Sequence, residues 1–278
     1  MFKKKIAVLL ASTVLVGSLA VGCGSKTSNE DEAKATKVTV SGSTSVGPAM
    51  EVVAEKYQEQ NQGVSIEIQQ VGSSAGVKNA IDGTSEIGMA SRDLKDEEKS
   101  SGLKETQIAL DGIAVITHKN NEVKDLTTDQ VKGIYTGKIT NWKEVGGKDA
   151  PIVVVSREDG SGTRDGFQDT VGFESEELTK DAQIGDGSGN IKTTVEGNEN
   201  AIGYISFGYA DDAINMLTID GVELTPENVK SNTYAIARPF VLVNKEDVIS
   251  EQGKKLIDFI LSDEGQEIME SKGLISIK

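Results

Sequence analysis

Hydroxyl and glycine residues recur in short turns of this chain, and an arginine accompanies one of the turns. The first turn spans residues 41–45 (Ser-Gly-Ser-Thr-Ser), the second 72–76 (Gly-Ser-Ser-Ala-Gly), and the third contains Ser91. The fourth, 159–163 (Asp-Gly-Ser-Gly-Thr), begins two residues after Arg157. Hydroxyls and exposed backbone amides donate hydrogen bonds, and one guanidinium can hold two oxygen atoms. These residue types together predict a site for an oxyanion.

Each turn follows a short β-like run, and the first two turns precede segments with helical periodicity. The runs are residues 37–40, 64–68, 87–90 and 152–155. Alternating strands and helices indicate parallel α/β sheets, in which ligands bind beyond the carboxyl ends of the strands. Because helix N-termini carry unpaired N–H groups and partial positive charge, they attract anions. We expect the four turns to converge; the alternative is that each turn only caps its own helix.

The composition excludes several classes of protein. The chain has 278 residues, of which 37% are hydrophobic and 26% charged, which argues against disorder and against a multi-span membrane protein. Its 29 basic residues against 44 acidic ones give a net charge of -15, so a nucleic-acid partner is not expected. Its length favours two domains, each with its own core.

The N-terminus resembles a secretory leader. Three lysines precede an apolar run that ends before Cys23, the only cysteine, so residues 1–22 are predicted to be a signal peptide and an intramolecular disulfide is impossible. The favoured interpretation is a lipobox with lipidated (palmitate-bearing) Cys23; the alternative is a transmembrane anchor with an incidental cysteine. Residues 23–36 are predicted to form a flexible tether. We therefore expect a lipoprotein anchored to the cell membrane on its extracytoplasmic face.

Two longer β-like runs, 112–117 and 234–243, are candidate hinges between lobes. If both runs pass from one lobe to the other, residues 37–114 and 239–278 form lobe I, and residues 115–238 form lobe II. Residues 250–261 and 262–272 are predicted to be helices, the second capped by a serine.

Enzyme mechanisms find little support in the residue pattern. Ser161 lacks the glycine two positions earlier that a nucleophile elbow requires, and no lysine completes a P-loop. His118 is the only histidine, and its ordinary interpretation is a solvated loop residue. The scattered carboxylates are better explained as solvated faces than as metal ligands. We predict no catalysis, no metal and no cofactor.

Two segments resemble a known family. Residues 135–147 (Tyr-Thr-Gly-Lys-Ile-Thr-Asn-Trp-Lys-Glu-Val-Gly-Gly) and 156–164 (Ser-Arg-Glu-Asp-Gly-Ser-Gly-Thr-Arg) closely resemble the phosphate-binding lipoprotein of the phosphate-specific ABC transporter. The first two turns match this family as well. The resemblance implies a two-lobed periplasmic-binding-protein fold of type II. It also implies high-affinity binding of inorganic phosphate and delivery to ABC transporter permease subunits for import.

The resemblance also assigns residues. It implies that the phosphate ligands are Thr44, Ser45, Ser73, Ser91, Arg157, Ser161, Gly162 and Thr163. Asp159 is expected to orient the Arg157 guanidinium; its alternative role is helix capping. Relatives carry an aspartate where this chain has Ser91, so the basis of selectivity against sulfate is open. Binding of another tetrahedral oxyanion, a secreted phosphate-handling enzyme, and an adhesion or signalling protein remain as alternatives.

Overall fold

The computed structural model describes residues 36–278. The predicted signal peptide, Cys23 and nearly all of the tether lie outside this range; Thr36, the last predicted tether residue, is the first residue of a strand. The described strands are β1 (Thr36–Gly42), β2 (Val64–Gln70), β3 (Ile87–Ala90), β4 (Lys104–His118), β5 (Asp125–Leu126), β6 (Val153–Arg157), β7 (Gln183–Gly185), β8 (Ala201–Ser206), β9 (Ile214–Met216), β10 (Thr218–Ile219) and β11 (Ala237–Asn244). The described α-helices are α1 (Gly47–Gln60), α2 (Ser73–Asp82), α3 (Asp96–Lys99), α4 (Thr128–Tyr135), α5 (Gly162–Val171), α6 (Gly187–Glu196), α7 (Pro226–Lys230), α8 (Glu251–Ile260) and α9 (Asp263–Ser271).

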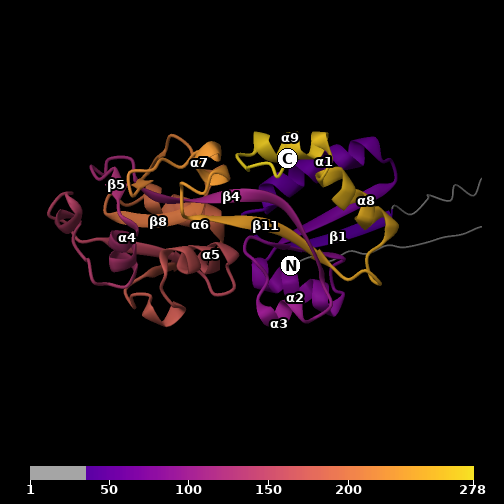
Figure 1. Cartoon of the computed structure of the whole chain (residues 1–278), viewed down its shortest axis with the longest axis horizontal. Coiled ribbons are helices and arrows are strands. Elements are labelled where there is room, and N and C mark those ends of the chain that lie inside the picture. The colour runs from indigo at the N-terminus through magenta and orange to yellow at the C-terminus, as the bar shows by residue number, and fades with distance from the viewer. Residues whose placement is uncertain (1–35) are drawn as a thin grey trace, which may run out of the picture. The chain divides into compact units, whose positions relative to one another are not determined.

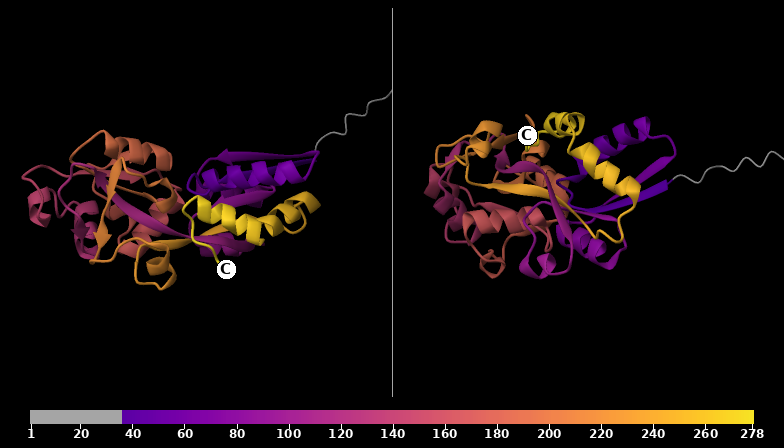
Figure 2. Two further views of the ribbon diagram at one scale, coloured as in Figure 1. Left: turned by 90° about the horizontal axis from the view of Figure 1, so that it is seen from above. Right: turned by 45° about the vertical axis from the view of Figure 1, so that its right-hand side comes forward.

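The first sheet region consists of β2, β1, β3, β11 and residues 104–112 of β4. β1 pairs in parallel with β2 and with β3, so the carboxyl ends of these three strands meet at one edge. Val40 of β1 and Met50 of α1 share a buried core, because alternate strand residues and every third or fourth helix residue face it. The C-terminal helices α8 and α9 pack beside α1, far from them in sequence (Figure 1, Figure 2).

The second sheet region consists of residues 113–118 of β4 with β8, β9, β6 and β7. β6 pairs in parallel with β7 and β8, so the turn after β6 lies at the carboxyl edge of this region. A separate core fills it, in which the rings of Phe167 and Tyr204 stack with centroids 4.0 Å apart. Each region therefore buries its own hydrophobic cluster, as two α/β units would.

β4 and β11 join the two regions (Figure 1). β4 pairs with β11 up to Gly112 and with β8 from Ile113 onward. The predicted run 112–117 lies in β4, but this strand begins earlier, at Lys104. Of the predicted run 234–243, only the part from Ala237 is strand; the Tyr234 hydroxyl instead donates to the Ile113 carbonyl at 2.9 Å. The lobe boundaries themselves stay a prediction.

The predicted C-terminal helices are confirmed, as is the predicted serine cap of the second one. The Ser250 hydroxyl accepts from the Gly253 N–H at the start of α8, and the Ser262 hydroxyl accepts from the Gly265 N–H at the start of α9. None of the helices in residues 36–278 is long and apolar enough to cross a membrane.

Candidate anion site

The predicted turns converge where the two sheet regions meet. The Ser45 hydroxyl, after β1, lies 2.9 Å from the Thr163 hydroxyl at the start of α5. The Ser74 N–H, in the first turn of α2, donates to the Gly160 carbonyl at 3.1 Å. Parallel strands bring three of the turns to one edge, and β6 brings the fourth from the other region. The convergence expected from the sequence is therefore present.

Arg157 is the last residue of β6, and its side chain contacts residues of both sheet regions. Its side chain is only 2% exposed. Nη1 donates to the hydroxyls of Thr163 (3.3 Å) and Ser188 (3.2 Å), and Nη2 donates to the Thr44 hydroxyl at 3.2 Å. The guanidinium thus provides a buried positive charge in the middle of the hydroxyl groups, as an oxyanion site requires.

Sequence reasoning missed Ser188. Its hydroxyl lies 3.0 Å from the Ser45 hydroxyl and accepts from Arg157. Ser188 follows β7 at the start of α6, which is the same strand, turn and helix order as the four predicted turns. The segment Gly-Asp-Gly-Ser-Gly at 185–189 could have indicated this fifth turn. It was not recognised because β7 before it has only three residues, none of them buried, so no apolar run predicts a strand there.

Ser73 and Ser91 form a second hydroxyl pair. Their Oγ atoms are 3.2 Å apart, and the Ser91 N–H donates to the Ser73 hydroxyl at 3.1 Å. Gly162 of the other region presses against this pair: a Cβ on Gly162 would lie 2.4 Å from the Ser73 Oγ and 2.8 Å from the Ser91 Oγ. Glycine is therefore required at this position for the two regions to approach.

Most of the helices that begin at the site lack a side-chain cap from their own N-cap residue. The N-cap residues of α1, α2 and α6 make no capping hydrogen bond with their own side chains, whereas the Ser161 hydroxyl caps α5 by accepting from the Arg164 N–H. At the start of α1 the Ser43 hydroxyl accepts from the Val46 N–H at 3.3 Å. The capping alternative therefore holds for Ser161 and for Ser43. In the three helices other than α5 some of the first N–H groups have partners, since Ser74 of α2 donates to the Gly160 carbonyl and Gly187 of α6 donates to the Glu158 carboxylate. The first-turn N–H groups without such partners keep their capacity to bind an anion.

The predicted partner of Arg157 is corrected by the structure. Glu158, not Asp159, binds the guanidinium with two hydrogen bonds, Nε to Oε2 and Nη2 to Oε1, both 2.7 Å. Asp159 is exposed and pairs with Arg164 at 2.6 Å, because the chain turns away from Arg157 at this point. Burial raises the pKa of Glu158, but the hydrogen bonds and charge of Arg157 outweigh this effect and lower the pKa overall.

A buried ion-pair cluster lies next to Ser91. Arg92 binds both carboxylate oxygens of Glu98, at 2.7 and 2.8 Å. Its Nε also lies 2.9 Å from the Asp165 carboxylate of α5, in the other sheet region. The cluster joins the regions beside the hydroxyl groups.

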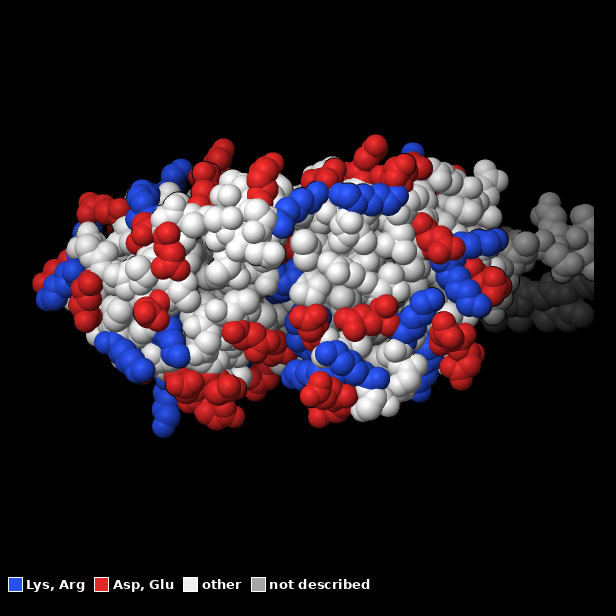
Figure 3. All heavy atoms as spheres, viewed as in Figure 1, with Lys and Arg blue, Asp and Glu red and all other residues white. Residues whose placement is uncertain are grey.

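The positive charge at the site is internal. On the face drawn in Figure 3, acidic and basic side chains are interspersed around broad uncharged areas.

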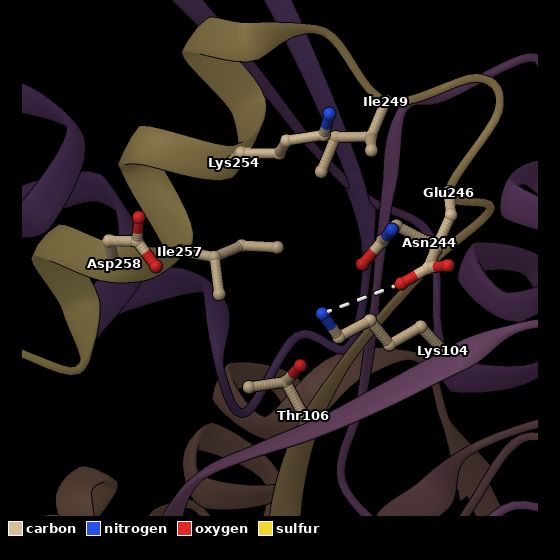
Figure 4. A pocket seen from close by; sticks show the side chains of 8 residues that line it. All are labelled: Lys104, Thr106, Asn244, Glu246, Ile249, Lys254, Ile257 and Asp258. Carbon is tan, nitrogen blue, oxygen red and sulfur yellow. Dashed lines mark ion pairs between the residues drawn. The ribbon is translucent and has the colours of Figure 1, made fainter.

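A pocket of about 310 Å³ (Figure 4) lies away from the anion site, between β4, the end of β11 and α8, with the Lys104–Glu246 ion pair (3.7 Å) at its side. Its lining contains none of the predicted site residues. Within residues 36–278 no three His, Cys, Asp or Glu side chains gather as metal ligands.

Known proteins are similar to this chain in sequence. Residues 27–264 match the family model of the PBP superfamily domain. The phosphate-binding protein PstS of Bacillus subtilis is 34% identical over 100% of this chain and 95% of its own length. PstS of Borreliella burgdorferi is 30% identical over 99% of both chains. The chain belongs to the PstS family of the PBP superfamily. The resemblance drawn from the two sequence segments is thereby confirmed.

Solved structures of PstS-like proteins have the same fold. A structure described as a phosphate ABC transporter substrate-binding protein with bound phosphate, from Clostridium perfringens, is 66% identical with a TM-score of 0.87; the match covers 87% of this chain and 100% of that one. An ABC-type phosphate transport receptor from Vibrio cholerae is 36% identical with a TM-score of 0.74, over 86% and 99% of the chains. The two-lobed fold of the PstS family is therefore the fold of this chain.

Proposed function

We propose that this protein is an extracytoplasmic receptor that binds inorganic phosphate between its two lobes and delivers it to an ABC transporter permease. The observation that carries the proposal is the position of Arg157, buried among hydroxyl groups that come from both sheet regions. Membership of the PstS family supports phosphate as the anion. Family members act as binding and transport receptors, and we propose that this chain performs no catalysis.

The site has the donors that such binding needs. The proposed ligands are those that the sequence indicated, with one addition, namely Thr44, Ser45, Ser73, Ser91, Arg157, Ser161, Gly162, Thr163 and Ser188. Charge-assisted hydrogen bonds contribute about 1.5 to 3 kcal/mol each. Several of them could supply the roughly 8 kcal/mol that a micromolar dissociation constant requires.

Ser91 is the proposed acceptor for the proton that phosphate retains. Arg157 donates to the hydroxyls of Thr44, Thr163 and Ser188. Each of these hydroxyls therefore accepts from the guanidinium, and its own proton points away from Arg157 toward another acceptor. Among the described residues the Ser91 hydroxyl is hydrogen-bonded only to Ser73, and when it donates its proton to Ser73 its lone pairs are free to accept. Sulfate carries no proton at neutral pH and would gain nothing from this acceptor.

We propose that phosphate closes the lobes about β4 and β11. The lobe bounds follow the sequence prediction, with 37–114 and 239–278 in one lobe and 115–238 in the other. β4 changes its pairing partner between Gly112 and Ile113, next to the proposed boundary.

The proposed anchor is a lipid on Cys23, which lies outside the described residues. The apolar run before the sole cysteine supports it. Cys23→Ser should abolish incorporation of labelled palmitate and leave the precursor unprocessed or shed from cells. Normal labelling and membrane retention of this variant would contradict the anchor and leave the binding function untouched.

A thermal-shift experiment tests the proposed ligand. Phosphate should raise the melting temperature of the purified protein in a concentration-dependent manner, because it binds only the folded state. Sulfate and molybdate should have much smaller effects, and arsenate, the closest analogue, should resemble phosphate. Absence of any shift with phosphate would overturn the proposal. Hydrolysis of a chromogenic phosphate ester would overturn the assignment as a receptor.

A further inference from the structure

A buried ion pair lies next to Ser45 of the anion site, on β4 and β11, the two strands that join the sheet regions. Asp111 of β4 and Arg238 of β11 are opposite each other in the strand register. Arg238 donates to the Asp111 Oδ2 from Nε (3.1 Å) and Nη2 (2.8 Å), and the side chains are 2% and 0% exposed. The Ser206 hydroxyl donates to the other carboxylate oxygen at 2.7 Å. The pair sits where β4 leaves β11 for β8.

The Arg238 guanidinium is held in one place and reaches Ser45. Besides the Asp111 contacts, it lies 5.3 Å from the centre of the Phe240 ring. α5 packs directly on it, since a Cβ on Gly166 would be 3.2 Å from the Arg238 Cδ. From this position Nη2 donates to the Ser45 hydroxyl at 3.4 Å, and Nη1 has no hydrogen-bond partner among residues 36–278.

This contact determines what the Ser45 hydroxyl can do. A hydroxyl that accepts from a guanidinium still has one proton to donate. The described partners left for the Ser45 proton are the hydroxyls of Thr163 and Ser188, at 2.9 and 3.0 Å, on the side where Arg157 lies. Asp111 offsets the charge of Arg238, as Glu158 offsets that of Arg157. Arg238 therefore acts on the site chiefly through the direction of this hydroxyl.

We propose that Arg238, fixed by Asp111, is a positioning residue of the phosphate site that keeps the Ser45 hydroxyl a donor toward the anion. The proposal rests on the proposed phosphate function and adds a residue to it. It also links the site to the two strands about which the lobes are proposed to close.

A double-mutant cycle tests this role. Calorimetric titration with inorganic phosphate would compare the protein and its Arg238→Met/Asp111→Asn variant, in which no charge is left unpaired. The same comparison would be made in the Ser45→Ala background. With Ser45 present, the Arg238→Met/Asp111→Asn change should weaken phosphate binding at least tenfold. In the Ser45→Ala background, the same change should weaken it by less than a further threefold. Equal losses in both backgrounds, or no loss in either, would overturn the proposal.

Two further variants keep the result decisive. Ser206→Ala is the matched control, because it removes a hydrogen bond from Asp111 without touching the Arg238–Ser45 contact; the phosphate affinity should stay within about threefold. If the Met/Asn variant does not fold, Arg238→Lys replaces it, because an ammonium keeps the charge but lacks the fork that reaches both Asp111 and Ser45. Its loss of affinity should again depend on Ser45. Failure of the unmutated protein to bind phosphate would instead overturn the proposed function.

Discussion

Among single residues, the carboxylate that orients Arg157 is one of two that follow it directly in the chain. The sequence places Glu158 and Asp159 next to each other, and both can reach a guanidinium. What decides between them is the path of the chain after β6: Glu158 also accepts from the Gly187 N–H at 3.2 Å, a contact from a distant segment. Glu158 is therefore held by both Arg157 of β6 and the start of α6, which fixes it as the partner of the guanidinium.

Arg157 is expected to dominate the binding of phosphate. Arg157→Ala should weaken binding by well over tenfold, since each lost charged hydrogen bond contributes about 1.5 to 3 kcal/mol. Arg157→Lys should recover little, because an ammonium cannot donate to three hydroxyls in the geometry of the fork. Calorimetric titration measures both effects. Lys143→Ala, which removes an exposed cation paired with Asp149, is the control and should bind normally. Normal binding by Arg157→Ala would contradict the assignment.

Glu98 is expected to give the protein acid-sensitive stability. Burial raises the pKa of Glu98, but hydrogen bonds from Arg92 and the Lys95 N–H, with the Arg92 charge, lower it overall. A folded-state pKa below the unfolded value of about 4.3 contributes stability that is present above that pH and lost as the pH falls through the folded-state pKa.

Glu98→Gln should therefore lower the melting temperature at pH 7 by a few degrees, since about 1 kcal/mol corresponds to roughly 2–4 °C for a chain of this size. The difference from the unmutated protein should shrink toward pH 3, and melting curves from pH 3 to pH 7 would measure it. Glu59→Gln, at an exposed ion pair with Lys56, should have no resolvable effect. A difference for Glu98→Gln that is the same at every pH would contradict this explanation.

At the scale of elements, the sequence was most informative where a buried strand leads into a polar turn. β3 has the residues predicted for it, and the turns after β1, β2, β3 and β6 meet as expected. β7 was missed because its residues are not buried and carry no apolar run. Arg238 was missed because nothing local distinguishes it: its role depends on Asp111, far away in sequence and adjacent only through strand pairing.

Gly162 is expected to control the approach of the two regions. In Gly162→Ala the new methyl group would meet the Ser73 and Ser91 hydroxyls, so phosphate binding should weaken by tenfold or more. The melting temperature without phosphate should change little, because the clash arises between regions and not within either core. Gly189→Ala is the matched control: its added Cβ would meet nothing within 4 Å. If both alanine variants bind phosphate equally well, this account of Gly162 is wrong.

For the molecule as a whole, phosphate binding is expected to close the two lobes on the ligand. Small-angle scattering should show a smaller radius of gyration at saturating phosphate than in phosphate-free protein, since lobes that rotate about two strands change their separation more than their interior. The Arg92–Asp165 ion pair at 2.9 Å joins the regions, so Asp165→Asn should weaken phosphate binding several-fold and reduce the fraction that closes. An unchanged radius of gyration on saturation would contradict closure.

The site is expected to select phosphate over sulfate, and competing titrations of phosphate-free protein with the two anions measure this selectivity. We expect micromolar or tighter binding of phosphate, with sulfate at least about 100-fold weaker. Ser91→Ala should narrow that difference more than Ser43→Ala, because the Ser43 hydroxyl already accepts from the Ser45 and Val46 N–H groups. Equal affinity of the unmutated protein for phosphate and sulfate would contradict the claim.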